Sequence, residues 1–291
     1  MGQTESTWMA ILRCPHCIAT GCDGDLLHEA DELRCPSCGR RYPVRDGIPI
    51  CVTEESPLRA ERDTGPRHAF STGAVRQRDY WEADTVHRDA RHPVVERFSR
   101  QRWAHLTRLI DLAGVREALD VGAGNGFSTL YAPEHVDAVA TDGSWRMLSR
   151  HPGRARVIAD AMTLPFASNA FDLVFCWELL HHVEEPWRAL REMARVSRKY
   201  VLFFEPNPLN PAQFLFALYD REHRWVLRFS RGFVLDQVKR AGLRTISFER
   251  CGLIFPNMTP LSLSRILARM PFSWPGVGIS QLVVAEKTHG A

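Results

Sequence analysis

Leu119-Asp120-Val121-Gly122-Ala123-Gly124-Asn125-Gly126-Phe127-Ser128-Thr129 is the stretch that decides the fold. Apolar residues run into it and out of it, which predicts a strand, a tight glycine turn and a helix that starts at Phe127. Gly122 allows the sharp turn, while Gly124 and Gly126 let the backbone approach a ligand near a helix N-terminus. A chain holds a nucleoside in this way.

The spacing of the glycines separates two kinds of nucleoside cofactor. A dinucleotide fingerprint has a glycine where Phe127 stands, whereas this chain has Asp120-x-Gly122-x-Gly124-x-Gly126. That pattern resembles the first motif of class I S-adenosylmethionine-dependent methyltransferases. The resemblance implies an α/β fold with a Rossmann-like seven-stranded sheet and helices on both faces. It also implies S-adenosyl-L-methionine as cofactor, bound at Asp120, Gly122, Ala123 and Gly124.

Two further acidic residues stand at predicted strand ends. The strand at 136–140 runs into Asp142, twenty residues beyond Gly122, a distance typical of a carboxylate that binds ribose hydroxyls. The strand at 155–159 ends at Asp160, where related enzymes hold the adenine amino group. Either aspartate alone is also explained as a helix cap. By the resemblance, Gly143 and Ala161 join these aspartates in the cofactor site.

The segment from Asn169 to Val183 resembles the fourth strand and following loop of the methyltransferase branch that includes ubiquinone and menaquinone biosynthesis enzymes (the type 11 domain). This resemblance places Trp177 and Glu178 beside the methionine part of the cofactor. It places His181 and His182 near the transferred methyl group. Imidazole titrates near neutrality, so these two histidines are the leading candidates for a catalytic base, unless one only caps a helix or fills space. Glu205 and His223 are further candidates.

The rest of the predicted methyltransferase domain, 93–291, follows the same fold. We expect helices at 93–112, 144–149, 185–197 and 231–241, and strands at 200–204, 245–249 and 281–285. The last strand should lie antiparallel beside the fifth. Apolar insertions at about 207–230 and 255–278 either cap the acceptor pocket or pack against the N-terminal domain, and we favour the pocket.

Four cysteines in two pairs mark a separate N-terminal domain at 1–55. Cys14, Cys17, Cys35 and Cys38 have the spacing of a four-thiolate site for structural Zn²⁺. Two disulfides are the alternative, which the lack of a signal segment disfavours. Four thiolates leave no open position for catalysis, and so small a unit needs a metal to fold.

The short strands on either side of an Asp-Gly turn at 41–50 complete the pattern of a zinc ribbon. It resembles the small activator proteins of tRNA and translation-factor methyltransferases. The ribbon could act as a stabilising clamp, a homodimer contact or a substrate grip. The linker at 56–92 contains Tyr80-Trp81-Glu82, which is either a lid over the cofactor or a local aromatic anchor.

Composition narrows the class of protein further. The 291 residues are 45% hydrophobic and 24% charged, which is ordinary for a globular chain. No apolar run is long enough to span a bilayer and no signal segment opens the chain, so we expect a cytoplasmic protein. The net charge is only +3, and basic and aromatic residues do not interleave, which disfavours nucleic acid.

Three functions follow from these observations. The first is O-methylation of a small or medium-sized metabolite, such as a sugar hydroxyl of a glycoside or glycolipid, or a natural-product phenol. The second is RNA methylation with the zinc ribbon as a grip. The third is a non-catalytic partner that keeps the fold without the activity. The apolar insertions and the paired histidines favour the first.

Overall fold

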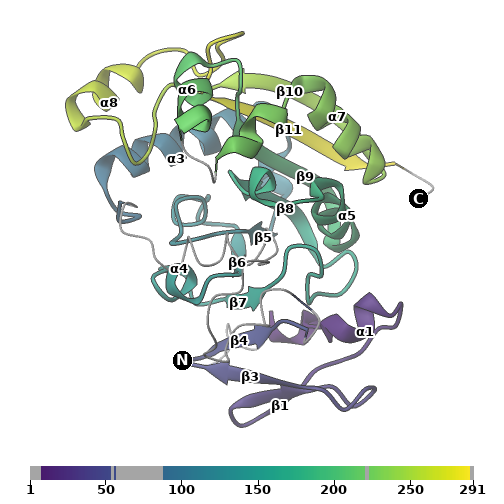
Figure 1. Ribbon diagram of the computed structural model, residues 1–291. Coiled ribbons are helices and arrows are strands. Elements are labelled where there is room, and N and C mark those ends of the chain that lie inside the picture. The colour runs from purple at the N-terminus through teal and green to yellow at the C-terminus, as the bar shows by residue number, and fades with distance from the viewer. Residues whose placement is uncertain (1–7, 54–55, 57–87, 220–222, 289–291) are drawn as a thin grey trace.

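The computed structural model describes residues 8–53, 56, 88–219 and 223–288 (Figure 1). Its strands are β1 (Leu27–Glu29), β2 (Glu32–Arg34), β3 (Arg41–Arg45), β4 (Ile48–Cys51), β5 (Glu117–Val121), β6 (Asp137–Asp142), β7 (Arg156–Ala159), β8 (Phe171–Trp177), β9 (Ser197–Pro206), β10 (Leu243–Cys251) and β11 (Ser280–Lys287). Its α-helices are α1 (Pro15–Ala19), α3 (Pro93–Leu106), α4 (Trp145–Ser149), α5 (Pro186–Val196), α6 (Pro211–Tyr219), α7 (Arg231–Arg240) and α8 (Leu261–Leu267). Short 3-10 helices are η1 (Met9–Ile11), η2 (Leu112–Gly114), η3 (Leu180–His182) and η4 (Arg224–Arg228).

Seven of these strands form the predicted methyltransferase sheet, in the order β7-β6-β5-β8-β9-β11-β10. The first five are parallel, and β11 runs antiparallel between β9 and β10, which confirms the expected place of the last strand. All seven residues of β8 are buried, as expected for a central strand that is covered on both faces.

Alternate residues of β8 enter two different hydrophobic cores. Val174 packs in the core that α5 and α7 cover, and Phe175 packs in the core that α3 covers. The period of two along a strand sends neighbouring side chains to opposite faces. The sheet therefore has helices on both faces, as the sequence predicted, and its carboxyl ends are left open between those layers.

The zinc ribbon is joined to this sheet by backbone pairing. Strand β4 runs parallel to β7, with Ile50 opposite Ile158 and Cys51 opposite Ala159. The β3–β4 hairpin turns at Asp46 and Gly47, both with positive φ, which suits the predicted Asp-Gly turn. The ribbon thus extends the sheet beyond β7 in Figure 1, a connection that the sequence did not predict.

Two predicted helices differ from the structure. The helix at 93–112 ends at Leu106, because the following amides bond carbonyls three residues back and turn the chain towards β5. No helix is assigned directly after the glycine loop, where 124–131 forms successive turns. The hydroxyls of Ser128 and Thr129 both donate to Asp120, which ties that segment to the end of β5.

The segments outside the minimal fold are partly described. The insertion at 207–230 contains α6 and η4, and that at 255–278 contains α8. The predicted lid residues Tyr80-Trp81-Glu82 lie outside the described residues. Within the ranges that the structure does describe, none of the helices combines the length and the apolar character needed to cross a bilayer.

Candidate functional site

A cavity of about 710 Å³ opens at the carboxyl ends of β5, β6, β7 and β8. Nearly all of the site residues predicted from the sequence line it, although they come from four separate segments of the chain. These are Gly122, Ala123, Gly124, Asp142, Gly143, Asp160, Ala161, Trp177, Glu178, His181 and His182. Asp120 is the exception, since it lies beneath the glycine loop and not on the cavity wall.

The glycine loop has a backbone conformation and a close approach to its neighbours that glycine adopts more easily than other residues. Gly122 has φ of +73°, and a Cβ built on it would lie 2.8 Å from Leu179 Cδ1. Its amide and that of Ala123 both donate to the Thr141 carbonyl, at 2.8 and 2.9 Å. The loop therefore lies flat against the end of β6, where its backbone borders the cavity.

Asp120 anchors this loop from below. Its carboxylate is fully buried, and one oxygen accepts hydrogen bonds from the Ser128 and Thr129 hydroxyls. Burial raises the pKa of Asp120 to about 7, although the two hydroxyl donors oppose the shift. The expected contact between Asp120 and the cofactor remains a prediction, since the structure gives this residue a different position from the other two aspartates.

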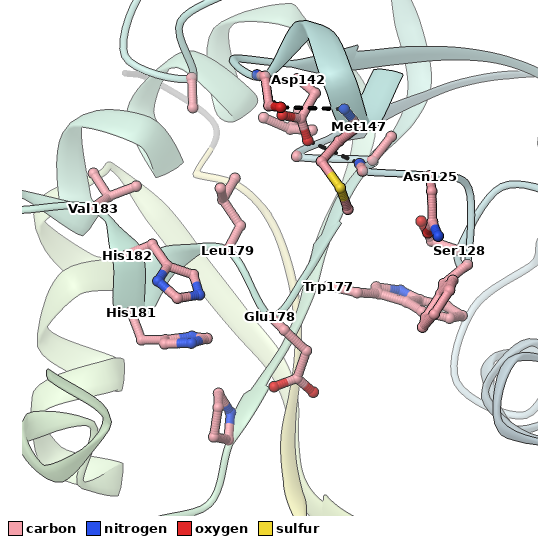
Figure 2. A pocket seen from close by; sticks show the side chains of 18 of the residues that line it. Asn125, Ser128, Asp142, Met147, Trp177, Glu178, Leu179, His181, His182 and Val183 are labelled. Atoms are coloured by element: carbon pink, nitrogen blue, oxygen red, sulfur yellow. Dashed lines mark hydrogen bonds between the residues drawn. The ribbon is translucent and has the colours of Figure 1, made fainter. Parts of the chain in front are cut away.

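Asp142 and Asp160 stand on the wall itself. Asp142 Oδ2 accepts from the Gly124 amide and Oδ1 accepts from the Ser144 amide, both at 2.8 Å (Figure 2). Asp160 Oδ1 accepts from the Met162 amide at 2.9 Å. These backbone contacts fix the orientation of both carboxylates at the cavity wall.

Arg102 on α3 contacts Glu178, and the sequence analysis did not predict this interaction. Its side chain is 1% exposed, and Nη2 lies 3.2 Å from Glu178 Oε1 and 2.7 Å from Ser280 Oγ. The guanidinium is also packed against the rings of Phe98 and Phe204, 3.9 and 4.3 Å from their centroids. The sequence shows only an arginine within the predicted helix at 93–112, and it could not reveal the pairing because the partner lies 76 residues away.

His181 is oriented by Glu205 at the other end of the cavity. Its Nδ1 lies 2.8 Å from Glu205 Oε2, and Glu205 also accepts from the amides of Leu180 and His181, at 2.6 and 3.1 Å. Burial raises the pKa of Glu205 to about 8, against the effect of these amides. Burial lowers the pKa of His181 well below its usual value, and the charge of Arg228 acts in the same direction, so the ring is neutral.

Three histidines gather at this end of the cavity. The rings of His181 and His182 have centroids 3.9 Å apart, and His223 lies 5.7 and 5.4 Å from them. Figure 2 shows the His181 and His182 rings side by side, near Glu178 and Leu179. His223, which the sequence suggested only as a further candidate, is brought here by the insertion at 207–230.

The two insertions also supply apolar wall. Phe216 from α6, together with Phe255 and Met258 from the second insertion, lines the same cavity as the glycine loop. Both insertions therefore border this cavity, while their role as caps of an acceptor pocket stays a prediction. Phe216 lies beside the histidines, with its ring centroid 4.7 Å from that of His223.

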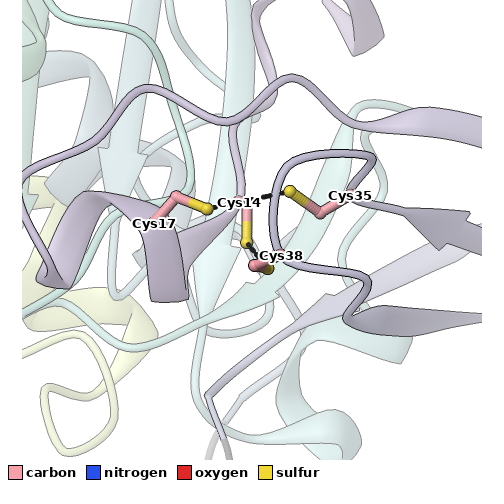
Figure 3. Close-up of side chains that lie close together, drawn as sticks. All are labelled: Cys14, Cys17, Cys35 and Cys38. Carbon is pink, nitrogen blue, oxygen red and sulfur yellow. Dashed lines mark hydrogen bonds between the residues drawn. The ribbon is translucent and has the colours of Figure 1, made fainter.

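The four ribbon cysteines converge as the spacing predicted (Figure 3). Cys14 and Cys38 have sulfurs 3.6 Å apart, and the sulfurs of Cys17 and Cys35 are 3.7 Å apart. Thiolates around a tetrahedral Zn²⁺ are about 3.8 Å apart, so the donor set fits this metal. Cys51 is buried and Cys22 is exposed, and neither belongs to the cluster.

Comparison with known proteins assigns both parts of the chain. Residues 119–204 match the model of a methyltransferase domain, and residues 6–47 match that of Trm112p-like proteins. Demethylmenaquinone methyltransferase of Renibacterium salmoninarum is 38% identical over 38% of this chain and 49% of its own length. That of Mycolicibacterium paratuberculosis is 31% identical over 57% of this chain and 70% of its own length.

Two other relatives extend the comparison. The 27-O-demethylrifamycin SV methyltransferase of Amycolatopsis mediterranei is 29% identical over 41% of this chain and 46% of its own length. A solved methyltransferase of Thermotoga maritima, described as a possible histamine N-methyltransferase, has 19% identity and a TM-score of 0.51 over 67% of this chain and 92% of its own. The last likeness shows the fold alone.

The chain spans about half the length of the first of these curated relatives. It covers more than two thirds of the Mycolicibacterium protein, however, at more than 30% identity. The matched segment contains the glycine loop, the acidic strand end at Asp142 and the histidine pair. The chain belongs to the S-adenosylmethionine-dependent methyltransferase family and has a Trm112-like zinc ribbon at its N-terminal end.

Proposed function

We propose that this chain transfers a methyl group from S-adenosylmethionine to a hydroxyl of a small or medium-sized metabolite. The acceptor class is a sugar hydroxyl of a glycoside or glycolipid, or a phenol of a natural product. Family membership supports the donor, and the apolar part of the cavity wall supports the acceptor. Apolar lining residues such as Phe216 and Phe255 suit a ligand with an apolar body.

The donor needs little chemical help, because its methyl group is already carried by a sulfonium. In the proposed step the carbon–sulfur bond breaks, the carbon–oxygen bond forms, and S-adenosylhomocysteine leaves. The protein has to align the two reactants, exclude water and remove the hydroxyl proton. Asp142 and the glycine loop would orient the donor, with Glu178 and its partner Arg102 beside the methionine part.

The observation that carries the proposal is the position of His181 Nε2. This atom is buried at the cavity and has no hydrogen-bond partner within the described part of the chain. With Nδ1 donating to Glu205, the lone pair of the neutral ring is on Nε2. The hydroxyl proton would pass to Nε2, and Glu205, ionised above its raised pKa of about 8, would stabilise the imidazolium that forms.

One relative supports an oxygen acceptor, since the name of the 27-O-demethylrifamycin SV methyltransferase specifies an oxygen. The names of the demethylmenaquinone methyltransferases specify no atom and do not bear on this choice. The apolar side chains that line the cavity disfavour RNA as the substrate. The convergence of eleven predicted site residues on one cavity speaks against a non-catalytic partner.

We also infer that the ribbon acts as a clamp on the cofactor side of the sheet. Strand β4 pairs with β7, whose chain continues into Asp160 on the cavity wall. The side chain of Ser56, just after the ribbon, donates to Asp160 Oδ2 at 2.7 Å. These contacts support a stabilising role for the ribbon over a homodimer contact.

The test uses labelled S-adenosylmethionine and a panel of glycosides and phenols. We expect label transfer to at least one hydroxyl acceptor, with turnover reduced by about 10²- to 10⁴-fold in His181→Ala. Affinity for S-adenosylhomocysteine should be unchanged in that variant. Full turnover in His181→Ala, or a product methylated on carbon or nitrogen, would contradict the proposal.

A further inference from the structure

The three histidines of the cavity have the arrangement of a metal-binding site. His181, His182 and His223 each offer a ring nitrogen, and these nitrogens all lie within 4.8 Å of one another. Imidazole nitrogens bound to Zn²⁺ at 2.0–2.1 Å are about 3.3 Å apart, so small side-chain rotations suffice to bring them onto one ion. We propose that His181, His182 and His223 form a site for a divalent transition-metal cation, separate from the zinc ribbon.

Glu205 supplies the second observation. A histidine that binds a metal through one nitrogen usually donates its other N–H to a carboxylate, which fixes the ring and raises its basicity. His181 has this arrangement, with Nδ1 2.8 Å from Glu205 Oε2. Its Nε2 is buried without a hydrogen-bond partner among the described residues, and the side chain is 1% exposed. A buried lone pair of this kind is suited to a cation.

The donor set defines the class of cation. Three imidazoles suit Zn²⁺, Co²⁺, Ni²⁺ and Cu²⁺, whereas Mg²⁺ and Ca²⁺ prefer oxygen ligands. Three protein ligands also leave a fourth position of a tetrahedral ion open. The site borders the cavity, so this position would be filled by water or by an oxygen or nitrogen of a cavity ligand.

The site has a consequence that rests on the proposed function. A cation and the acceptor proton would need the same lone pair on His181 Nε2. A bound cation would therefore exclude proton transfer to His181 and inhibit methyl transfer. His223 lies outside that proton path, so His223→Ala should remove the cation while it leaves His181 in place.

The test is a cobalt titration of the full chain with zinc already bound to the ribbon. We expect one further Co²⁺ per chain, with visible absorption bands of nitrogen ligation and none of the intense sulfur-to-metal bands that thiolates produce. His223→Ala and His182→Ala should weaken this binding by at least about 100-fold, and Glu205→Gln by about 10- to 100-fold. His28→Ala, an exposed histidine of β1, is the matched control and should bind as the wild type does.

Folding of each variant is checked by its ribbon zinc content and by its affinity for S-adenosylhomocysteine. Failure of the folded wild type to bind a second cation, or equal binding in all of the cavity variants, would overturn the metal site. In that event a loss of turnover in His181→Ala would still uphold the proposed function. Cobalt binding lost in His223→Ala would support the metal site even if His181→Ala turned over normally, a result that would remove only the proposed base.

Discussion

Arg102 Nη2 lies 3.2 Å from Glu178 Oε1, and this pair links the helix before the methyltransferase sheet to the wall of the cavity. The two side chains differ in exposure, since Arg102 is 1% exposed and Glu178 is 32% exposed. Glu178 itself has φ of +59°, in the left-handed region that side-chain-bearing residues seldom adopt. We therefore propose that Arg102 is a positioning residue, which holds the side chain of Glu178 at the cavity wall although the backbone of Glu178 is strained.

Replacing Arg102 tests this relationship. Arg102→Met should destabilise the chain by about 1.5–3 kcal/mol, because it removes the charge-assisted hydrogen bonds from Arg102 to Glu178 and Ser280. It should also weaken binding of S-adenosylhomocysteine. Arg100→Met is the control on the same helix, since Arg100 is exposed and pairs with Glu96 at the surface, a contact worth about 0–1 kcal/mol. Thermal unfolding and calorimetry measure the two effects, and equal behaviour of the two variants would refute the role of Arg102.

Two glycines allow the steric contact in the glycine loop to be tested separately from backbone strain. Gly122 and Gly47 have nearly the same φ, +73° and +71°, but an added Cβ meets Leu179 at 2.8 Å in the first case and nothing within 4 Å in the second. Each alanine variant should lose about 1 kcal/mol of stability from strain alone. Only Gly122→Ala should also lose affinity for S-adenosylhomocysteine, as measured by calorimetry. A similar loss in Gly47→Ala would show that the loop contact is unimportant.

The raised pKa of Asp120 predicts how the free energy of unfolding depends on pH. Its pKa is raised to about 7 in the folded chain, so between about pH 4 and 7 the folded state holds a proton that the unfolded state has released. Its contribution to stability therefore falls as the pH rises through this window, by on the order of 2–4 kcal/mol. Asp120→Asn should flatten that part of the pH profile.

Chemical denaturation of both proteins between pH 5 and 8 measures the difference. The exposed Asp137→Asn variant at the start of β6 provides a control and should parallel the wild type. An Asp120→Asn profile with the same slope as the wild type would mean that Asp120 is already ionised at pH 5.

The clamp predicts the effect of metal removal. Cys35→Ser should lower zinc content and the melting temperature, because β4 and the apolar edge of β7 depend on a folded ribbon. Cys22→Ser alters an exposed cysteine outside the cluster and should change neither. Full thermal stability in zinc-free Cys35→Ser would contradict the clamp.

Local patterns predicted most of the site, and long-range contacts account for the rest. The glycines, Asp142, Asp160 and the histidine pair stand at strand ends, and parallel strands bring their carboxyl ends to one edge of a sheet. Arg102 could not be predicted in this way, because its pairing with Glu178 depends on how α3 packs. The β4–β7 pairing was missed for a similar reason, since edge strands carry no sequence mark of their partner.

The segment after Gly126 does not form the predicted helix, because a tertiary contact outweighs its helix propensity. The sequence after Gly126 is compatible with a helix, but Ser128 and Thr129 bind the buried Asp120 carboxylate and the segment forms turns. Burying the Asp120 carboxylate without hydrogen-bond donors would cost more free energy than the segment would gain by forming a regular helix. His223 likewise reaches the histidine pair only because the insertion at 207–230 folds over the cavity.

Calorimetric titration of the zinc-loaded chain with S-adenosylhomocysteine, in the wild type and in Asp142→Ala, tests the central claim most directly. The account predicts one ligand per chain and a loss of about 1–3 kcal/mol of binding free energy in the variant, from lost charge-assisted hydrogen bonds. No binding by the folded wild type, or equal affinity in the two proteins, would contradict the assignment of this cavity as the cofactor site.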